Sequence, residues 1–493
     1  MIESPLFRTE VSLSRATSYA EWAEAARELD RRNGWQAWRE QDHSEFFDYR
    51  SIRRRLDRLS ELRDAGDDHG LLFALNEGIH GNMDGMASDQ LWRDNRFGTK
   101  QLIHDYVDAI ADALLHLASP AVTTISFEDK RDFFRRAHHC YGCSALLMSG
   151  SGAFLFFHAG VVKALWSEGL LPGIISGSSG GSVVGAMVCT NRDEDMAPLF
   201  DPERLVREYE NDGGQTLLNP LRQSKRMSQE QVRERIAEIL PDVTFQEAFE
   251  LTGRHLNISI APAEKHQNGR LLNAITSPNV FVREAVLASC AVPGIYAPVA
   301  LNARSSDGSR VPYLPGRKWV DGSVTHDLPS KRLSRLYGVN HHIVSQANPL
   351  ITPFASDVTQ HAGPFAAIRR ASVSTFKAWL NASMQLWDKP LQMVPQLHSL
   401  ANMTLSVINQ DYSGDINIVR PLMLWSPDKI LSNLSLEDVR NLMDMGERAT
   451  WPKIEMVRTQ TRISQTLERI LIDYEQPMPD DEPKPRAMKK KLG

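Results

Sequence analysis

Apolar residues recur along the chain at two different periods, and the change of period divides the chain into regions. From residue 1 to about 140 they recur at helical spacing, as in Tyr19–Leu29 and Ile52–Leu62. From about 144 to 340, short apolar runs alternate with helical stretches. This alternation predicts a protein of the α/β class, with a mostly parallel sheet flanked by helices. Beyond Pro349 the helical spacing returns.

These patterns predict four regions. They are a helical N-terminal domain (1–140), an α/β core domain (144–340), a mainly helical C-terminal region (341–474) and a tail (475–493). The 493 residues suffice for a core domain of about 200 residues with flanking units. A helix is expected from Thr450 to Tyr474, with Pro452 in its first turn. The tail is rich in proline and charge, so we expect it to be disordered.

The run Gly177–Gly181 places Ser179 between two glycines, at the spacing of a nucleophile elbow. A strand-like run precedes it and a helix-like run follows it. A serine at such a turn has strained backbone and an exposed hydroxyl, and Gly177 and Gly181 leave room on both sides. The helix that follows directs its N-terminal N–H groups at charge developing near the serine. An ordinary Gly/Ser turn gives the same short pattern, so this motif alone does not establish a catalytic site.

A second glycine-rich turn lies upstream, between the strand-like run Ala145–Met148 and a helical stretch. There Gly150, Ser151 and Gly152 would present successive backbone N–H groups, which is how a protein builds an oxyanion hole. A phosphate-binding loop or a buried turn are the alternatives. A Walker loop is disfavoured because no Gly-Lys-Ser/Thr closes the run, and Lys163 lies well inside the helix.

A third motif ends an apolar strand with an acidic residue, at Asp321-Gly322-Ser323. A carboxylate beside a serine can accept its proton, but an exposed aspartate with a pKa of about 3.9 is a weak base. Burial or backbone donors would therefore have to tune its pKa. A second Asp-Gly-Ser, Asp307–Ser309, lies in a polar run that predicts a solvated hairpin loop, so we favour Asp321.

These three motifs, in this order, resemble the patatin-like phospholipase family. The resemblance implies that 144–340 is a patatin-like catalytic domain, in which a serine–aspartate dyad hydrolyses acyl esters without a catalytic histidine. The resemblance makes Ser179 the nucleophile and Asp321 the general base, and places Gly150–Gly152 in the oxyanion segment.

The resemblance covers nearly the whole chain. It is specific to a branch with an extra N-terminal domain, the triacylglycerol and steryl-ester lipases of fungi and plants and their bacterial relatives. The matching segments are Phe47–Arg50, Asn82–Gly85, Gly98–Ile103, Ala288–Pro298, His342–Pro349, Gln410–Ile416 and Ala449–Lys453.

Some motif positions depart from the family pattern. Leu155 replaces the last glycine of the GxGxxG oxyanion motif, and Ser151 stands where this branch often has glycine. Ser323 replaces the glycine or alanine that usually ends the acidic motif. None of these changes touches the reacting side chains, so we expect the chemistry to survive. They also leave open an alternative, a catalytically weak or inactive lipid-binding or scaffold protein.

A Ser–Asp–His triad of the α/β-hydrolase type is a second catalytic hypothesis, with His326 or His341 as the base. His326 comes only five residues after Asp321, whereas a triad histidine normally comes from a separate loop. We therefore favour the dyad.

Composition weighs against several other functions. Lys and Arg number 56 and Asp and Glu 61, a net charge of −5, so no overall basic field favours nucleic acid as a partner. Cys140 and Cys143 form a CxxC beside His138 and His139, but the chain lacks a second ligand pair at suitable spacing. We expect no metal site, and the chemistry implied by the resemblance needs no organic cofactor. Four cysteines in this length indicate a reducing cytosol.

No signal peptide or transmembrane segment is predicted. The N-terminus mixes apolar, polar and acidic residues, unlike a signal peptide. His158 and Lys163 interrupt the longest apolar stretch, Ala145–Trp166, so it does not suit a membrane span. We expect a cytoplasmic enzyme with a lipid ester substrate at a membrane or droplet surface, making peripheral contact at most; the sequence does not define the oligomeric state. The aromatic stripe Phe365–Trp387 suits a lipid interface or packing over the active site. Likewise, Arg53–Arg55 could contact anionic headgroups or form a solvated helix face.

Overall fold

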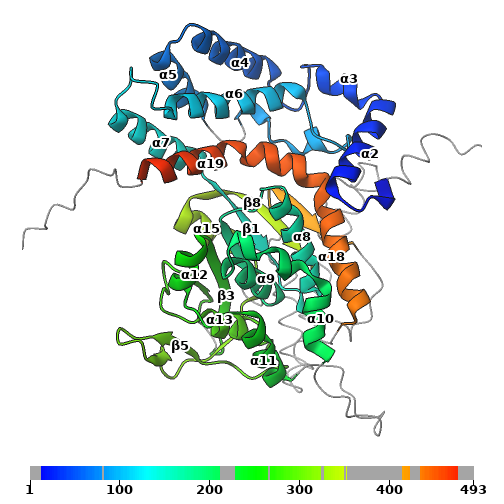
Figure 1. Ribbon diagram of the computed structural model, residues 1–493, viewed down its shortest axis with the longest axis vertical. Helices are drawn as coiled ribbons and strands as arrows, with labels where there is room; N and C mark the ends of the chain where they lie inside the picture. Colours follow the sequence, from blue (N-terminus) through cyan, green and yellow to red (C-terminus); the bar gives the residue numbers. More distant parts are fainter. Residues whose placement is uncertain are drawn as a thin grey trace, which may run out of the picture. The chain divides into compact units, whose positions relative to one another are not determined.

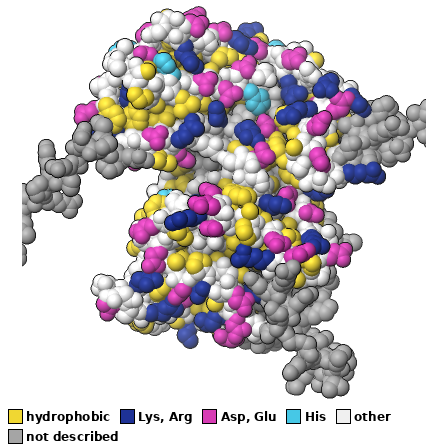
Figure 2. Space-filling model, viewed as in Figure 1, with side chains coloured by type: hydrophobic (Ala, Val, Ile, Leu, Met, Phe, Trp, Pro, Cys, Tyr) yellow, Lys and Arg dark blue, Asp and Glu magenta, His cyan; other side chains and the backbone are white. Residues whose placement is uncertain are grey.

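The computed structural model of the protein describes residues 13–79, 83–210, 228–264, 267–323, 327–348, 351, 414–421 and 434–475 (Figure 1). The aromatic stripe Phe365–Trp387, His326 and the tail beyond Glu475 lie outside these residues. Among the helices in the described part of the chain, none combines the length and the apolarity that crossing a bilayer requires. On the face drawn in Figure 2, basic and acidic side chains are intermixed.

The chain forms two compact units that interleave in sequence. We call the first the sheet unit; it comprises Met1–Gln41, Ser88–Lys100 and Cys143–Thr459. We call the second the helical unit; it comprises Asp42–Ala87, Gln101–Gly142 and Gln460–Gly493. Each unit is described by itself below.

A seven-stranded sheet organises the sheet unit (Figure 1). Its strands are β1 (Cys143–Met148), β2 (Ile174–Gly177), β3 (His255–Pro262), β4 (Arg270–Leu272), β7 (Trp319–Asp321), β8 (Val339–Gln346) and β9 (Ile416–Val419). Six follow the order β4-β3-β2-β1-β8-β9, and β7 pairs with β3. All pairs from β3 across to β9 are parallel, whereas β4 and β7 run antiparallel to β3. The prediction of a mostly parallel sheet is confirmed.

The central strands are buried along their whole length, as parallel strands covered on both faces must be. Every residue of β1 and of β2 is buried. Because neighbouring strands are parallel, the loops that follow β1, β2 and β8 leave the same edge of the sheet. Two of the three predicted site motifs, the turns after β1 and β2, therefore meet at that edge.

The helices of the sheet unit pack on the sheet and on one another. They are α2 (Tyr19–Arg32), α3 (Trp35–Glu40), α8 (Leu155–Ser167), α9 (Gly180–Cys189), α10 (Pro202–Glu210), α11 (Gln229–Ile239), α12 (Phe245–Thr252), α13 (Val282–Ser289), α15 (Ser330–Tyr337) and α18 (Leu436–Thr450). The helices α9 and α13 contact β3, and α15 contacts β8.

The contact between α8 and α18 depends on two glycines. A Cβ atom on Gly160 of α8 would overlap the carbonyl oxygen of Met443, and a Cβ on Gly446 of α18 would overlap the carbonyl oxygen of Phe157. The two backbones therefore approach more closely than any side chain would permit. This contact holds α8, the helix that follows the predicted oxyanion turn, against α18.

A small hairpin contains the second Asp-Gly-Ser. Its strands are β5 (Leu301–Arg304) and β6 (Arg310–Tyr313), paired antiparallel. The Ser309 hydroxyl and N–H both donate to Oδ1 of Asp307, at 2.6 and 2.9 Å, in the turn between these strands. The predicted hairpin loop is confirmed, and this aspartate caps a solvated turn.

The helical unit is built from α4 (Tyr49–Asp64), α5 (Asp68–Gly78), α6 (Gln101–Ala118) and α7 (Phe127–Tyr141) (Figure 1). Side-chain caps begin α4 and α5: Asp48 accepts from the Ser51 N–H at 3.1 Å and Asp67 from the Gly70 N–H at 2.8 Å. In 13–79 and 83–140 the described backbone forms helices and turns without strands. The predicted helical character of the N-terminal region is confirmed.

The C-terminal region combines the predicted helices with two strands that periodicity did not reveal. The helix α19 (Ile454–Glu475) follows a 3-10 turn that contains Pro452, close to the expected bounds. However, β8 and β9 belong to the central sheet. In β9 only Ile416 and Ile418 are fully buried, and four residues are too short a run for the period to identify a strand.

Candidate active site

Ser179 lies at the turn between β2 and α9, as the elbow motif predicts. Its backbone has φ 49° and ψ −124°, a combination that costs on the order of 1–3 kcal/mol for a residue with a side chain. Gly181 makes the turn possible, because a Cβ there would come 2.5 Å from the Met148 carbonyl oxygen and 2.7 Å from that of Ser149. The backbone of the elbow therefore packs directly against the end of β1.

Hydrogen bonds from distant segments fix the elbow. The Ser179 N–H donates to Oγ of Ser289 at 2.9 Å, and the Ser289 hydroxyl donates to the Ser259 carbonyl oxygen at 2.8 Å. The Ser178 hydroxyl donates to the backbone carbonyl oxygen of Asp327 at 3.0 Å. Sequence reasoning missed Ser289 and Asp327, because no local pattern distinguishes one buried serine or aspartate as the partner of a turn elsewhere.

Asp321 ends β7 and is 1% exposed. The Ser323 N–H donates to its Oδ1 at 2.8 Å. Burial raises the pKa of Asp321 to about 6, while hydrogen bonds from Ser323 and from the Ser179 side chain act to lower it. The structure thus brings Asp321 beside the Ser179 hydroxyl. The carboxyl has the burial that the sequence argument required of a base.

The predicted oxyanion segment follows β1 and contacts the elbow. A Cβ on Gly180 would lie 2.7 Å from the Gly152 carbonyl oxygen and would overlap the Ser151 hydroxyl. The Gly150 N–H is already occupied, because it donates to Oδ1 of Asp327 at 2.7 Å. The N–H groups of Ser151 and Gly152 donate to no other residue in the described part of the chain. Of the three predicted residues, these two therefore have the available donors.

A buried histidine holds the start of this segment. His158 of α8 is fully buried, with Nε2 3.0 Å from the Ser149 carbonyl oxygen and Nδ1 2.7 Å from Oγ of Ser345. Burial lowers the pKa of His158 to about 3, so its ring is neutral near pH 7. The carbonyl oxygen can only accept, so Nε2 carries the proton and Nδ1 accepts from the Ser345 hydroxyl. The sequence marked His158 only as a polar interruption of an apolar stretch.

The motif departures fit their surroundings. A Cβ on Gly150 would lie 3.0 Å from Cβ of Ser323, so the acidic motif packs directly against the oxyanion segment and a small side chain is needed there. Leu155 begins α8, and its Cβ would lie 3.1 Å from a Cβ on Gly180. Glycine at 180 thus leaves the space beside Leu155.

His341 lies far from the elbow. It is the partner of Ser144 in the β1–β8 ladder, and its Nδ1 is 3.0 Å from the Ser144 hydroxyl. The predicted oxyanion turn begins after Met148, four residues further along β1, which at about 3.3 Å per residue is roughly 13 Å away. This position disfavours His341 as a triad base.

The mostly parallel sheet, flanked by helices, defines the chain as an α/β protein. Ser179, the buried Asp321 and the glycine-rich loop after β1 form its candidate site. The family model described as patatin-like phospholipase matches residues 146–332, and a domain of unknown function, DUF3336, matches residues 6–139. The chain belongs to the patatin-like phospholipase family.

Its curated relatives come from fungi and plants. The triacylglycerol lipase ptl2 of Schizosaccharomyces pombe is 31% identical over 477 residues, which cover 93% of this chain and 74% of that protein. The triacylglycerol lipase SDP1L of Arabidopsis thaliana is 31% identical over 472 residues, which cover 92% of this chain and 57% of that protein. The chain covers only part of the length of other relatives: it aligns to 54% of one fungal relative and to 60% of another. Among solved structures, VipD from Legionella pneumophila aligns over 50% of this chain and 55% of its own, with 14% identity and a TM-score of 0.25.

Proposed function

We propose that the protein is a serine acyl-ester hydrolase, a lipase or phospholipase that cleaves fatty acids from triacylglycerol or glycerophospholipid with a Ser179–Asp321 dyad. The observation that carries the proposal is the buried Asp321 carboxyl beside the Ser179 hydroxyl, next to a loop with available N–H groups. Two of its relatives are named triacylglycerol lipases, which supports this substrate class. The proposed setting is cytoplasmic, with peripheral contact at a lipid surface.

The reaction would proceed by acyl transfer in two steps. Asp321 takes the proton from Ser179 as its Oγ attacks the ester carbonyl carbon, and the N–H groups of Ser151 and Gly152 stabilise the oxyanion. Collapse of the tetrahedral intermediate breaks the ester bond. The departing alkoxide takes the proton from Asp321 and leaves as diacylglycerol, lysophospholipid or sterol. Water, deprotonated by Asp321, then attacks the acyl-serine. As the acyl–oxygen bond breaks and the fatty acid leaves, the Ser179 oxygen takes the proton back from Asp321.

The pKa of Asp321 suits this role. A carboxyl with a pKa of about 6 is ionised at neutral pH yet more basic than an exposed aspartate. Ser179 has a strained backbone that holds its side chain at the turn, so little further ordering is needed before attack. Neither step requires a metal ion or an organic cofactor.

A labelling experiment tests the proposal. Purified protein should react with a fluorophosphonate probe at Ser179, and should release fatty acid from a panel of triacylglycerol, phospholipid and steryl esters followed by mass spectrometry. Ser179→Ala and Asp321→Asn should each lower hydrolysis about a thousand-fold or more. Asp307→Asn is the matched control, because Asp307 has the same Asp-Gly-Ser sequence in a solvated turn, and it should retain full activity.

The alternative function is a lipid-binding or scaffold protein with a weak or inactive site, motivated by Leu155 and Ser151. Folded protein that binds lipid vesicles but neither reacts with the probe nor hydrolyses any ester in the panel would favour this alternative. A known serine hydrolase labelled alongside shows that the probe is reactive.

A further inference from the structure

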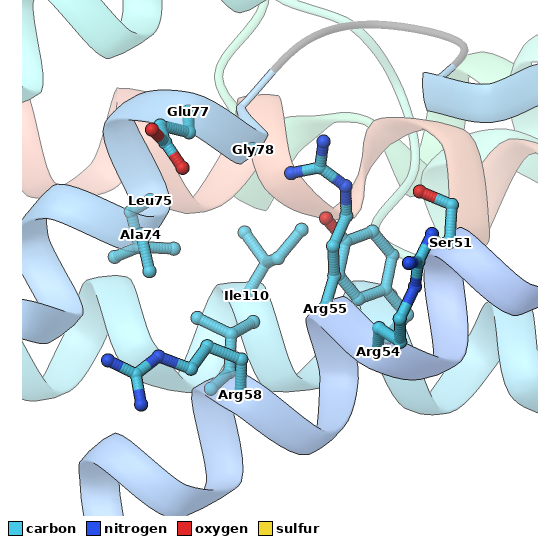
Figure 3. A pocket seen from close by; sticks show the side chains of 11 residues that line it. Ser51, Arg54, Arg55, Arg58, Ala74, Leu75, Glu77, Gly78 and Ile110 are labelled. Atoms are coloured by element: carbon cyan, nitrogen blue, oxygen red, sulfur yellow. The ribbon is translucent and has the colours of Figure 1, made fainter.

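A cavity of about 300 Å³ opens in the helical unit between α4, α5 and α6 (Figure 3). Its walls combine three arginines of α4 with apolar and aromatic side chains of the other two helices. The main lining residues are Arg54, Arg55, Arg58, Leu75, Tyr106 and Ile110. All of them belong to the helical unit, so the cavity does not involve the Ser179–Asp321 site.

Helical spacing explains why these arginines share a face. Position 58 is four residues after 54 and three after 55, so Arg58 shares a helix face with each of them, and the three side chains extend from one side of α4, as Figure 3 shows. Arg53 is directed elsewhere, and its Nε and Nη2 donate to the carboxylate of Asp42 at 2.9 and 2.8 Å. The arginine run in the sequence is therefore divided between an ion pair and a cavity wall.

Arg55 lines the cavity beside Tyr106, and its side chain forms a hydrogen bond with the Tyr106 hydroxyl. Its Nε is buried and is 3.7 Å from Oδ2 of Asp84, too far for a hydrogen bond, and it has no other hydrogen-bond partner among the described residues. A Cβ on Gly78 would lie 3.3 Å from the Tyr106 Oη and 3.6 Å from Nη1 of Arg55. Because residue 78 is glycine, no side chain occupies the space beside Tyr106 and Arg55.

The other two arginines keep most of their donors available. Arg54 uses Nε for a long, 3.3 Å bond to the carbonyl oxygen of Arg50. Arg58 is 3.5 Å from Glu61, and both side chains are more than half exposed, so this ion pair is weak. Glu77 also lines the cavity and is the one acidic side chain among its lining residues. A guanidinium carries five N–H donors, so the cavity presents a surplus of donors and of positive charge.

We propose that this cavity binds a phosphate group. Arginine forks match phosphate oxygens in pairs. Arg54 and Arg58 hold most of their N–H donors ready for such a ligand, and Arg55 adds positive charge to the same wall. A lipid headgroup or a free phosphate compound would supply the same group. The apolar side chains of Leu75 and Ile110 beside the arginines also suit an amphiphilic ligand.

The test uses the full chain and two kinds of probe. Sedimentation with vesicles of phosphatidylcholine, with and without a tenth of phosphatidic acid, measures binding to a lipid phosphate. Calorimetry with inorganic phosphate and with glycerol 3-phosphate measures binding to the free group. Saturable binding in the first arm alone identifies a headgroup site, whereas binding in the second arm identifies a site for free phosphate.

Variants of the lining residues test whether the vesicles or the free phosphate bind in this cavity. Arg55→Gln and Arg54→Gln should each weaken it roughly ten-fold, the loss expected for one charge-assisted hydrogen bond. Gly78→Leu should abolish binding by filling the cavity beside Tyr106 and Arg55, and its melting temperature shows whether the unit remains folded. Arg136→Gln is the matched control; Arg136 is an exposed arginine of α7 paired with Asp132, so the variant removes the same charge away from the cavity. No binding in either arm, or equal weakening by Arg136→Gln and Arg54→Gln, would overturn the proposal.

Discussion

The backbone N–H of Gly150 donates a 2.7 Å hydrogen bond to Oδ1 of Asp327, a residue 177 positions further along the chain. The backbone carbonyl oxygen of the same aspartate accepts from the Ser178 hydroxyl. One buried residue therefore contacts both the oxyanion segment and the elbow. In the proposed reaction, Asp327 would orient the N–H groups of Ser151 and Gly152 as a positioning residue without contacting the substrate.

Replacing Asp327 should impair turnover more than substrate binding. Asp327→Ala leaves the Gly150 N–H buried without its acceptor, which costs about 1–3 kcal/mol of stability, and frees the loop to move. We expect kcat to fall about ten- to a hundred-fold with KM little changed. Asp327→Asn keeps an acceptor oxygen and should recover most of the rate. Steady-state kinetics on a soluble ester measures both, and an equal loss in the two variants would contradict a positioning role.

The acid limb of the pH–rate profile should report Asp321. Its carboxyl must be ionised to act as a base, so kcat/KM should fall about ten-fold per pH unit as the pH drops below about 6. The Ser323 hydroxyl stabilises the ionised form, so Ser323→Ala should raise this pKa and move the limb to higher pH. A limb that moves to lower pH, or stays in place, would argue against Asp321 as the titrating base.

His158 should make the fold sensitive to acid. Its pKa is about 3 in the folded protein and about 6.5 in the unfolded chain, so between these values the unfolded chain binds one more proton. The free energy of unfolding should then decrease as the pH falls through this window, by up to about 1.4 kcal/mol per pH unit from this residue.

Chemical denaturation at pH 7, 6, 5 and 4 measures this dependence. His158→Gln offers an amide in place of the ring and cannot titrate, so its unfolding free energy should fall less steeply over the same range. His69→Gln, which replaces an exposed histidine of α5, is the matched control. If His158→Gln and the parent protein lose stability equally with falling pH, His158 is not the cause of the acid sensitivity.

Gly160→Ala should be strongly destabilising. The added Cβ overlaps the Met443 carbonyl oxygen, so α8 and α18 must separate, at a cost of about 1–3 kcal/mol or more. Gly173→Ala is the control, because a Cβ there has nothing within 4 Å, and it should be neutral or slightly stabilising. Thermal melts of the two variants measure the difference. Equal melting temperatures would show that the helices adjust without cost.

The sequence predicted those parts of the site that local patterns encode. Ser179 and Asp321 each stand at the end of an apolar run beside glycine, and the strands β2 and β7 lie where those runs predict them. The residues that position them could not be found in this way. Ser289 contacts Ser179 across 110 positions and His158 contacts Ser345 across 187. Such pairs are created by the sheet order, which no periodicity in one segment specifies.

The place of β8 beside β1 has a practical consequence for anyone who shortens the chain. A fragment cut to the matched segment, 146–332, would lose the first three residues of β1 and both strands that follow it in the sheet. The remainder of β1, apolar and normally enclosed, would become an open edge able to pair with other molecules. Such a fragment should aggregate, and the loss of activity would then say nothing about Ser179.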